Sequence, residues 1–136
     1  MRDDNCIFCK LANGIIPTNS IYEDEHFNVI LDMSPATKGH ALILPKDHYK
    51  NLYELPEDTA AEVMKLAKKM AVEMTEKLGA DGFNLVQNNN EIAGQTVFHF
   101  HMHLIPRYEN DRQRIAWIPT SPSAEELAEI KATLTK

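Results

Sequence analysis

Alternating apolar and polar positions divide the chain into short strands and longer helical segments. Five runs match strands, at residues 21–22, 27–31, 40–44, 83–86 and 97–105. Three segments match helices, at residues 7–11, at 56–78 and from about Ser123 onward. The early strands follow one another with short turns, and helices come between the later ones. This order predicts an antiparallel sheet in an α+β domain.

The longest helical segment, at residues 56–78, has an apolar stripe at three- and four-residue spacing. Pro56 suits the first turn of this helix, and Gly79 suits the position just past its end. We expect the stripe to face the core, and its members are Ala60, Val63, Met64, Ala67, Ala71, Met74 and Leu78.

The run 97–105 contains three of the six histidines at alternate positions. If the whole run is a strand, its side chains alternate between the two faces of the sheet. His99, His101 and His103 then form a row with about 6.6 Å between neighbours. Imidazole acts as a nucleophile, an acid or base, or a metal ligand near neutral pH. We expect the other face to turn toward the core, with Phe98, Phe100, Met102 and Leu104.

Length, charge and cysteine content restrict the possible classes of protein. The chain of 136 residues fits one domain. A formal net charge of -6 argues against a nucleic-acid partner bound through many phosphates. No apolar run approaches the ~20 residues of a membrane span, and no signal peptide is recognisable at the N-terminus, so we expect a cytoplasmic protein without a membrane partner. In that setting, Cys6 and Cys9 favour metal binding over a structural disulfide.

Two kinds of chemistry fit the histidine row. In the first, two or three imidazoles hold Zn²⁺ and leave one position open for water. In the second, His101 attacks an electrophile as a neutral nucleophile, and His103 hydrogen-bonds a phosphate oxygen or the leaving group. The preceding loop suits a phosphate, because Gly94 permits close backbone approach and Thr96 offers a hydroxyl and an N–H.

The run 94–105 resembles the signature of the histidine-triad (HIT) family of nucleotide hydrolases and transferases. Segments 21–24, 31–35 and 39–48 also resemble family segments in the same order, so that the likeness extends from about Cys6 to Arg107. The chain is most similar to the small single-domain branch that cleaves purine nucleoside phosphoramidates. The resemblance implies one domain over residues 1–136, with a core at 6–107 and a variable tail at 108–136.

The resemblance also implies a fold and a set of residue roles. The fold would be a five-stranded antiparallel sheet with flanking helices, paired into a homodimer with one continuous sheet. His101 would be the nucleophile, with His103 and His40 beside the phosphate, and Asp32 would hold the ribose hydroxyls. The phosphate would lie among Asn88, Gly94, Gln95 and Thr96, and the base among Ile7, Phe8, Leu11, Ile30 and Met33. Those five apolar residues could equally be plain core.

A structural zinc site follows from the resemblance to relatives such as the uridylyltransferase branch. Cys6 and Cys9 supply two of the four ligands that structural zinc requires. His48 and His99 stand where those relatives supply the other two. A pair of free thiols or a redox dithiol are the alternatives.

Together these features predict a nucleotide hydrolase that cleaves at the α-phosphorus through a nucleotidyl-histidine intermediate. The substrate would be a purine nucleotide, and no organic cofactor is expected. The alternatives are a dinucleoside polyphosphate hydrolase, a metal-dependent hydrolase that uses the triad as ligands, and a nucleotide-binding regulatory module. The sequence pattern assigns neither the leaving group nor the base, and it gives no role to Trp117.

Overall fold

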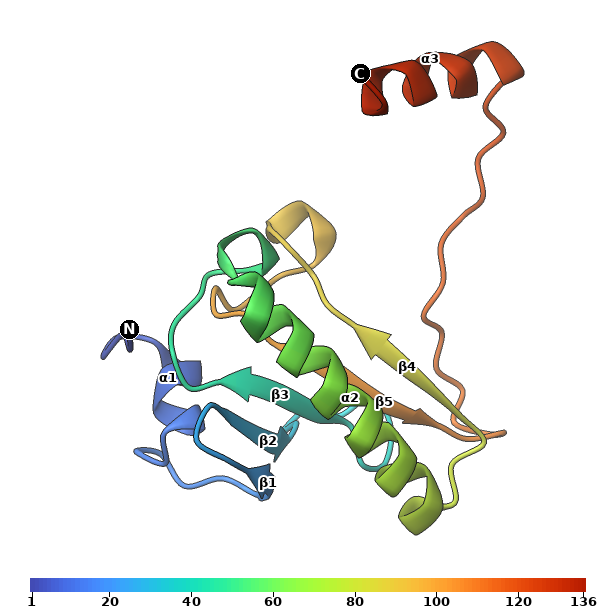
Figure 1. Cartoon of the computed structure of the whole chain (residues 1–136). Helices are drawn as coiled ribbons and strands as arrows, with labels where there is room; N and C mark the ends of the chain where they lie inside the picture. The colour runs from blue at the N-terminus through green and yellow to red at the C-terminus, as the bar shows by residue number, and fades with distance from the viewer.

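An antiparallel sheet of five strands forms the centre of the computed structural model, which describes residues 1–136 (Figure 1). The strand order is β1-β2-β3-β5-β4, and every neighbouring pair is antiparallel. The predicted α+β class with five antiparallel strands is confirmed. The bounds are β1 Ser20–Glu23, β2 Phe27–Leu31, β3 Ala41–Pro45, β4 Gly82–Val86 and β5 Met102–Arg107.

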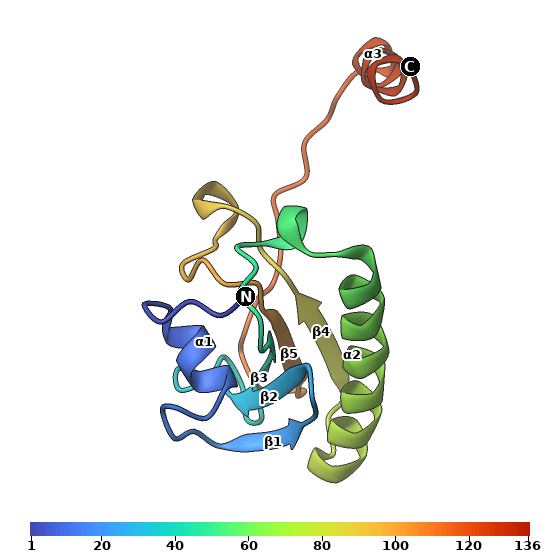
Figure 2. The ribbon, with the colours of Figure 1, turned by 60° about the vertical axis from the view of Figure 1, so that its left-hand side comes forward.

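Helices cover both faces of this sheet. The short helix α1 (Ile7–Ala12) lies on one face, and α2 (Glu57–Leu78) lies on the other (Figure 2). Two single turns of 3-10 helix, η1 (Leu52–Glu54) and η2 (Glu91–Ala93), lie at one end of the sheet. The last helix, α3 (Ala124–Leu134), begins directly after the predicted Ser123, which caps it through its side chain.

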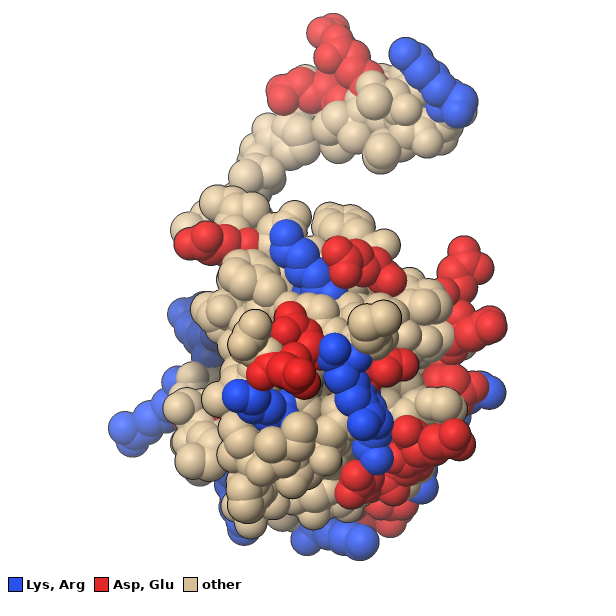
Figure 3. Space-filling view, turned by 90° about the vertical axis from the view of Figure 1, so that its left-hand side faces the viewer, with Lys and Arg blue, Asp and Glu red and all other residues tan.

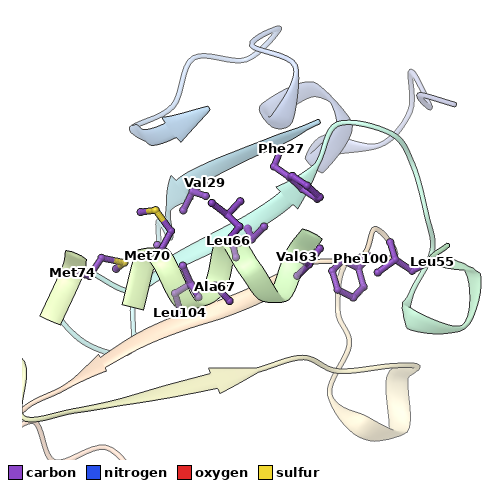
Figure 4. Close-up of a cluster of buried hydrophobic side chains, with 12 residues drawn as sticks. Phe27, Val29, Leu55, Val63, Leu66, Ala67, Met70, Met74, Phe100 and Leu104 are labelled. Atoms are coloured by element: carbon purple, nitrogen blue, oxygen red, sulfur yellow. The ribbon is translucent and has the colours of Figure 1, made fainter. Parts of the chain in front are cut away.

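The central strand β3 is buried along its whole length, because its two faces belong to different parts of the core. Ile43 and its neighbours face α2 in the larger cluster, where Phe27, Val29 and Leu104 meet the helix (Figure 4). Leu42 belongs to the smaller cluster beneath α1, which Ala12, Ile30, Leu42 and Leu44 form. Since His103 is the cross-strand partner of Leu42, it projects on the α1 face.

The bounds of α2 follow from its two terminal residues. Pro56 has extended backbone angles and is the N-cap, so the helix begins one residue later than predicted. Gly79 ends the helix in the left-handed conformation at φ 69°, which glycine adopts without strain. The inward face differs in part from the predicted stripe, because Met64 is 53% exposed whereas two unpredicted residues, Leu66 and Met70, are buried.

Strand β5 is shorter than predicted, because residues 97–101 form an irregular segment that precedes it. The Phe100 amide donates to the Tyr49 carbonyl over 2.6 Å, so this segment runs beside the connection that follows β3. The alternation of side chains survives in part, since Phe100 and Leu104 are buried in the core. Phe98 is 44% exposed, and its predicted core position was wrong.

The segment after Arg107 leaves the body of the molecule. Arg107 forms an ion pair with Asp111 over 2.8 Å, and an extended stretch of chain then leads to α3, which stands apart from the sheet (Figures 1 and 3). Most apolar side chains of this tail are largely exposed, including Trp117 and Ile118. No helix of the chain combines the length and hydrophobicity that a membrane crossing requires.

Candidate active site and metal cluster

A pocket of about 680 Å³ lies on the α1 face of the sheet, between α1, the end of β2 and the loop before β5. One wall is apolar and comes from Ile7, Phe8, Leu11, Ile30 and Met33. The polar part of the lining consists of His101, His103, Asp32 and the loop residues Asn88, Gly94 and Thr96. The pocket therefore joins an apolar slot to a cluster of hydrogen-bonding groups.

The loop that follows β4 is held by one buried side chain. Gln95 accepts a hydrogen bond from the Asn90 amide over 2.8 Å and donates to the carbonyls of Lys50 and Val97. These bonds fix Asn90 at a positive φ of 72° and Gly94 at φ 99°. Gly94 approaches Asn88 closely, since a β-carbon on Gly94 would lie 3.4 Å from the Asn88 Nδ2 atom.

The ring of His101 is oriented from outside the pocket. Its Nδ1–H donates to the carbonyl of His99 over 2.7 Å. The neutral ring therefore carries its lone pair on Nε2, as a nucleophile requires. The Phe8 ring packs edge-on against the imidazole, with centroids 4.9 Å apart at 90°.

A chain of hydrogen bonds sets the proton on His103. The Ala36 amide donates to His40 Nδ1 over 2.9 Å, so the neutral His40 ring holds its proton on Nε2. That proton faces His103 Nδ1 at 2.9 Å, and the neutral His103 ring is therefore protonated on Nε2. Asp32 lies 3.5 Å from His40 Nε2 and also accepts from the Ser34 amide.

Burial keeps these imidazoles neutral. Loss of solvent lowers the pKa of His40 and of His101 below the ordinary 6.5, although the carboxylate of Asp32 acts in the opposite direction on both. Burial and the neighbouring rings of His101 and His40 lower the pKa of His103 to about 4. At neutral pH the site therefore offers one nucleophilic nitrogen and one N–H donor.

Asp32, His40 and His103 also have the composition of a metal site, since their ligand atoms lie within 4.8 Å of one another. The Ala36 amide argues against this use. A metal on His40 Nε2 would require the proton on Nδ1, where it would face the Ala36 N–H donor. We therefore assign these three residues to hydrogen bonding.

A second cluster lies behind the histidine row and consists of Cys6, Cys9, His48 and His99, which we call the cysteine–histidine cluster. The Nδ1 atom of His99 lies 3.4 Å from each sulfur, and Nδ1 of His48 lies 3.5 Å from the Cys9 sulfur. Tetrahedral zinc with bonds of about 2.3 Å to sulfur and 2.0 Å to nitrogen places such atoms about 3.5 Å apart. The four residues fit zinc.

The hydrogen bonds around the cysteine–histidine cluster also favour a cation. His99 donates from Nε2 to the Pro45 carbonyl over 2.9 Å, which leaves the Nδ1 lone pair free to bind a metal. Backbone amides of Cys9 and Asp3 donate to the sulfurs of Cys6 and Cys9. Burial raises the pKa of the Cys9 thiol to about 11 without a metal, so a bound cation is needed to hold both sulfurs as thiolates.

Comparison with known proteins assigns the family. The HIT domain model matches residues 13–110. The chain belongs to the HIT family. Adenosine 5′-monophosphoramidase hnt1 of Schizosaccharomyces pombe is 39% identical to this HIT protein over 129 residues, which is 94% of this chain and 92% of the relative.

Two solved HIT structures share the fold. A HIT family protein from Bacillus anthracis has a TM-score of 0.88 at 42% identity, with 96% of this chain and 95% of that chain covered. A Zn-bound histidine triad family protein from Mycobacterium smegmatis has a TM-score of 0.76 at 36% identity, with 95% and 97% covered.

Most residues predicted from the HIT signature line the pocket or form the cysteine–histidine cluster, but Gln95 and His40 do neither. His40 reaches the pocket only through its hydrogen bond to His103. The Gln95 side chain is 1% exposed and bonds to the loop backbone, and its ligand contact stays a prediction. The sequence reading missed part of the pocket wall, namely Ile16, Pro17, Thr18 and Val97. These residues lie in irregular segments where no periodicity indicates the direction of a side chain.

Proposed function

We propose that this HIT protein hydrolyses purine nucleoside phosphoramidates or related nucleotides at the α-phosphorus through a nucleotide bound covalently to His101. The observation that carries the proposal is the orientation of His101. Its Nδ1–H is held by the His99 carbonyl, and its ring lines the pocket beside Gly94 and Thr96. The name of the S. pombe relative supports this class of substrate.

In the first step, the Nε2 lone pair of His101 attacks the α-phosphorus. The phosphorus–nitrogen bond breaks, and the leaving nitrogen takes up a proton from solvent and departs as an amine. The nucleotidyl-imidazolium that remains is cationic, and its Nδ1–H keeps its hydrogen bond to the His99 carbonyl. His103 faces the same pocket and donates from Nε2 to a phosphate oxygen or to the leaving group.

In the second step, water attacks the phosphorus and the bond to Nε2 breaks. The water releases one proton, and the products are the nucleoside monophosphate and neutral His101. We expect the Thr96 hydroxyl, the Asn88 amide and the backbone at Gly94 to hold the phosphate oxygens during both steps.

The apolar end of the pocket suits the nucleoside. We place the base between α1 and the end of β2, against Phe8, Leu11 and Ile30. Asp32 lies between this slot and the histidines, where its carboxylate can accept hydrogen bonds from both ribose hydroxyls.

A quenched incubation with adenosine 5′-phosphoramidate tests the proposal. Wild type should show a transient nucleotidyl adduct by intact mass and should release AMP. His101→Ala should show neither and should still bind the nucleotide, because the rest of the pocket remains in place. Tight binding with neither adduct nor AMP in wild type would contradict the phosphoramidase assignment and favour a binding module. Turnover of a dinucleoside polyphosphate alone would move the assignment to the other leaving group.

We also propose that the cysteine–histidine cluster holds one structural zinc ion. Zinc supplies no chemistry to the reaction there, and its role is to fix α1 to the segments that carry His48 and His99. The zinc-bound M. smegmatis relative supports the choice of metal. Elemental analysis of the untagged protein should find close to one zinc per chain, and a value near zero would reject the site.

We infer a homodimer and a cytoplasmic location. We also propose, as the sequence predicts, that the chain is a single domain with a variable tail after Arg107. Strand β4 is at the edge of the sheet and has no neighbour beyond it, which suits pairing with a second copy. The cytoplasmic location agrees with the proposed metal role of Cys6 and Cys9, which requires reduced thiols.

A further inference from the structure

The residue that orients the nucleophile is itself part of the cysteine–histidine cluster. His99 places its Nδ1 atom 3.4 Å from both sulfurs, while its backbone carbonyl accepts the Nδ1–H of His101 over 2.7 Å. His99 is fully buried. His99 therefore faces the sulfurs through its side chain and fixes His101 through its backbone, so a displacement of the whole residue changes both contacts.

Helix α1 provides a second connection between the cluster and the pocket. Cys6 is the N-cap of α1 and Cys9 is its third residue, with Phe8 between them. Phe8 packs edge-on against His101 at 4.9 Å and also lies 6.1 Å from the His99 ring. The sulfurs that would hold a metal thus also hold the aromatic ring that confines the nucleophile.

One of the two sulfurs can be reached from outside. Cys6 and His48 line an open hollow of about 600 Å³ that also borders Lys50 and Thr96. Cys9 is buried behind Cys6, and its amide donates to the Cys6 sulfur over 3.3 Å. A small oxidant in this hollow therefore meets Cys6 first and has Cys9 directly behind it.

We propose that Cys6 and Cys9 are an oxidation site that controls the nucleophile, with Phe8 and His99 as the positioning residues that transmit the change to His101. The oxidant is a peroxide. The reduced, metal-binding state is active, and the disulfide state is inactive. The proposal rests on the role of His101 in the proposed function.

The chemistry balances in two steps. The Cys6 thiolate attacks one oxygen of hydrogen peroxide, the oxygen–oxygen bond breaks, Cys6 becomes a sulfenic acid, and the other peroxide oxygen leaves as hydroxide. The Cys9 thiolate then attacks the Cys6 sulfur, the sulfur–oxygen bond breaks, and a second hydroxide leaves. The two sulfurs lose two electrons, and the two hydroxides take up protons to become water. The C-x-x-C spacing on one helical turn allows the bridge.

Disulfide formation removes two of the four ligands at once, so a bound zinc ion is released. His99 then loses the partners of its Nδ1 atom, and α1 loses its link to His48 and His99. We expect His101 to leave the orientation in which Nε2 faces the phosphate. A misplacement of about 1 Å is enough to lower turnover about 100-fold.

The test treats the zinc-loaded wild type with hydrogen peroxide and quenches it with a thiol alkylating agent. Intact mass should show that both cysteines escape alkylation, and a colorimetric zinc indicator should detect one released equivalent. The kcat on adenosine 5′-phosphoramidate should fall at least about tenfold. Dithiothreitol followed by zinc should restore it, which distinguishes the disulfide from methionine sulfoxide.

Histidine side-chain NMR provides a readout that does not depend on activity. The His101 signals should shift or broaden on oxidation, whereas those of the exposed His26 should not. Unchanged His101 signals in the disulfide form would overturn the proposal, even if zinc had left. If the untreated protein releases no AMP, the proposed function is rejected. The oxidation proposal is then still decided by comparing the His101 NMR signals of the reduced and disulfide forms.

Cys6→Asp is the matched variant, because aspartate caps a helix well and offers an oxygen ligand in place of the thiol. With one cysteine left, no internal disulfide can form. The ratio of treated to untreated activity should stay close to one in this variant, with zinc retained. An equal peroxide sensitivity in Cys6→Asp and wild type would overturn the proposal. If Cys6→Asp binds no zinc, the wild type decides the outcome through two results: whether dithiothreitol and zinc restore its kcat, and whether its His101 NMR signals change on oxidation.

Discussion

Backbone groups fix the position of the proton on three of the histidines. A carbonyl fixes the proton of His101 on Nδ1, another fixes the proton of His99 on Nε2, and an amide fixes that of His40 on Nε2. His101 thereby presents the lone pair of Nε2 and His99 that of Nδ1, although all three residues have the same side chain. For each imidazole, the hydrogen bond made by one ring nitrogen determines whether the other nitrogen offers a lone pair or an N–H.

Activity should persist into mild acid. The proposed nucleophile His101 must be neutral, and burial lowers its pKa below 6.5, so protonation begins only at a lower pH than for a free imidazole. The acid limb of kcat/KM should therefore lie below pH 6.5, with His103 titrating near 4. A pH–rate profile, with circular dichroism at each pH to confirm folding, checks this. An inflection at or above 6.5 would contradict the assigned environment.

Gly94→Ala should impair catalysis more than it impairs folding. A β-carbon at φ 99° strains the backbone and would lie 3.4 Å from the Asn88 side chain that lines the phosphate end of the pocket. We expect a stability loss of about 1–2 kcal/mol and a fall in kcat/KM of about tenfold or more.

Gly14→Ala is the matched control for Gly94→Ala. Gly14 also has a positive φ, of 74°, but nothing lies within 4 Å of its added β-carbon. Thermal unfolding should show similar losses for both variants, and steady-state kinetics should show a defect in Gly94→Ala alone. Equal kinetic defects would refute the role of the loop.

The HIT resemblance named the residues that the structure brings together, and their roles stay proposals. His101 and Asp32 line one pocket, and the four residues of the cysteine–histidine cluster lie within reach of one another. The direction of the Gln95 side chain was not predictable, because its amide could equally serve a ligand or the loop backbone. The sequence leaves this choice open, because it depends on the path of residues 88–97 and on the position of the Lys50 carbonyl.

Helix α2 is stabilised by its inward face, and Leu66→Ala tests which face that is. Leu66 is buried in the core cluster, so its truncation should cost about 2–5 kcal/mol of unfolding free energy. Met64→Ala, at an exposed position two residues away, should cost less than about 1 kcal/mol. Denaturant unfolding of both variants checks this, and a larger loss for Met64→Ala would reverse the assigned face.

Element types were predictable, whereas the start of β5 was not. The alternating pattern of apolar and polar residues at 97–105 continues through the irregular segment, although burial there does not alternate: His99, Phe100 and His101 are all buried, and Phe98 is exposed. The irregular segment differs from β5 in its backbone partner, because the Phe100 amide donates to the Tyr49 carbonyl. That contact joins residues far apart in the sequence, so a local pattern does not reveal it. An alternating pattern therefore indicates a strand only where a neighbouring strand is also present.

On the face shown in Figure 3, acidic and basic side chains are interspersed, and no large patch of one sign covers it. An acidic protein can still bind an anionic nucleotide, because the phosphate end of the pocket offers neutral N–H and hydroxyl donors rather than lysines. Net charge therefore limits the extent of a phosphate-binding surface, and the local donors determine whether a single phosphate is held.

The proposed dimer depends on the free edge of β4. Leu85 lies on this strand at 41% exposure, and the edge has no covering element in the sheet order. Leu85→Lys places a charge where the second copy would pair, so the dissociation constant should rise at least about tenfold. Val72→Lys adds the same charge at an exposed apolar position of α2 and should leave association unchanged. Sedimentation velocity of the three proteins at equal concentration decides the matter. A monomeric wild type would reject the dimer, and equal dissociation of both variants would place the interface elsewhere.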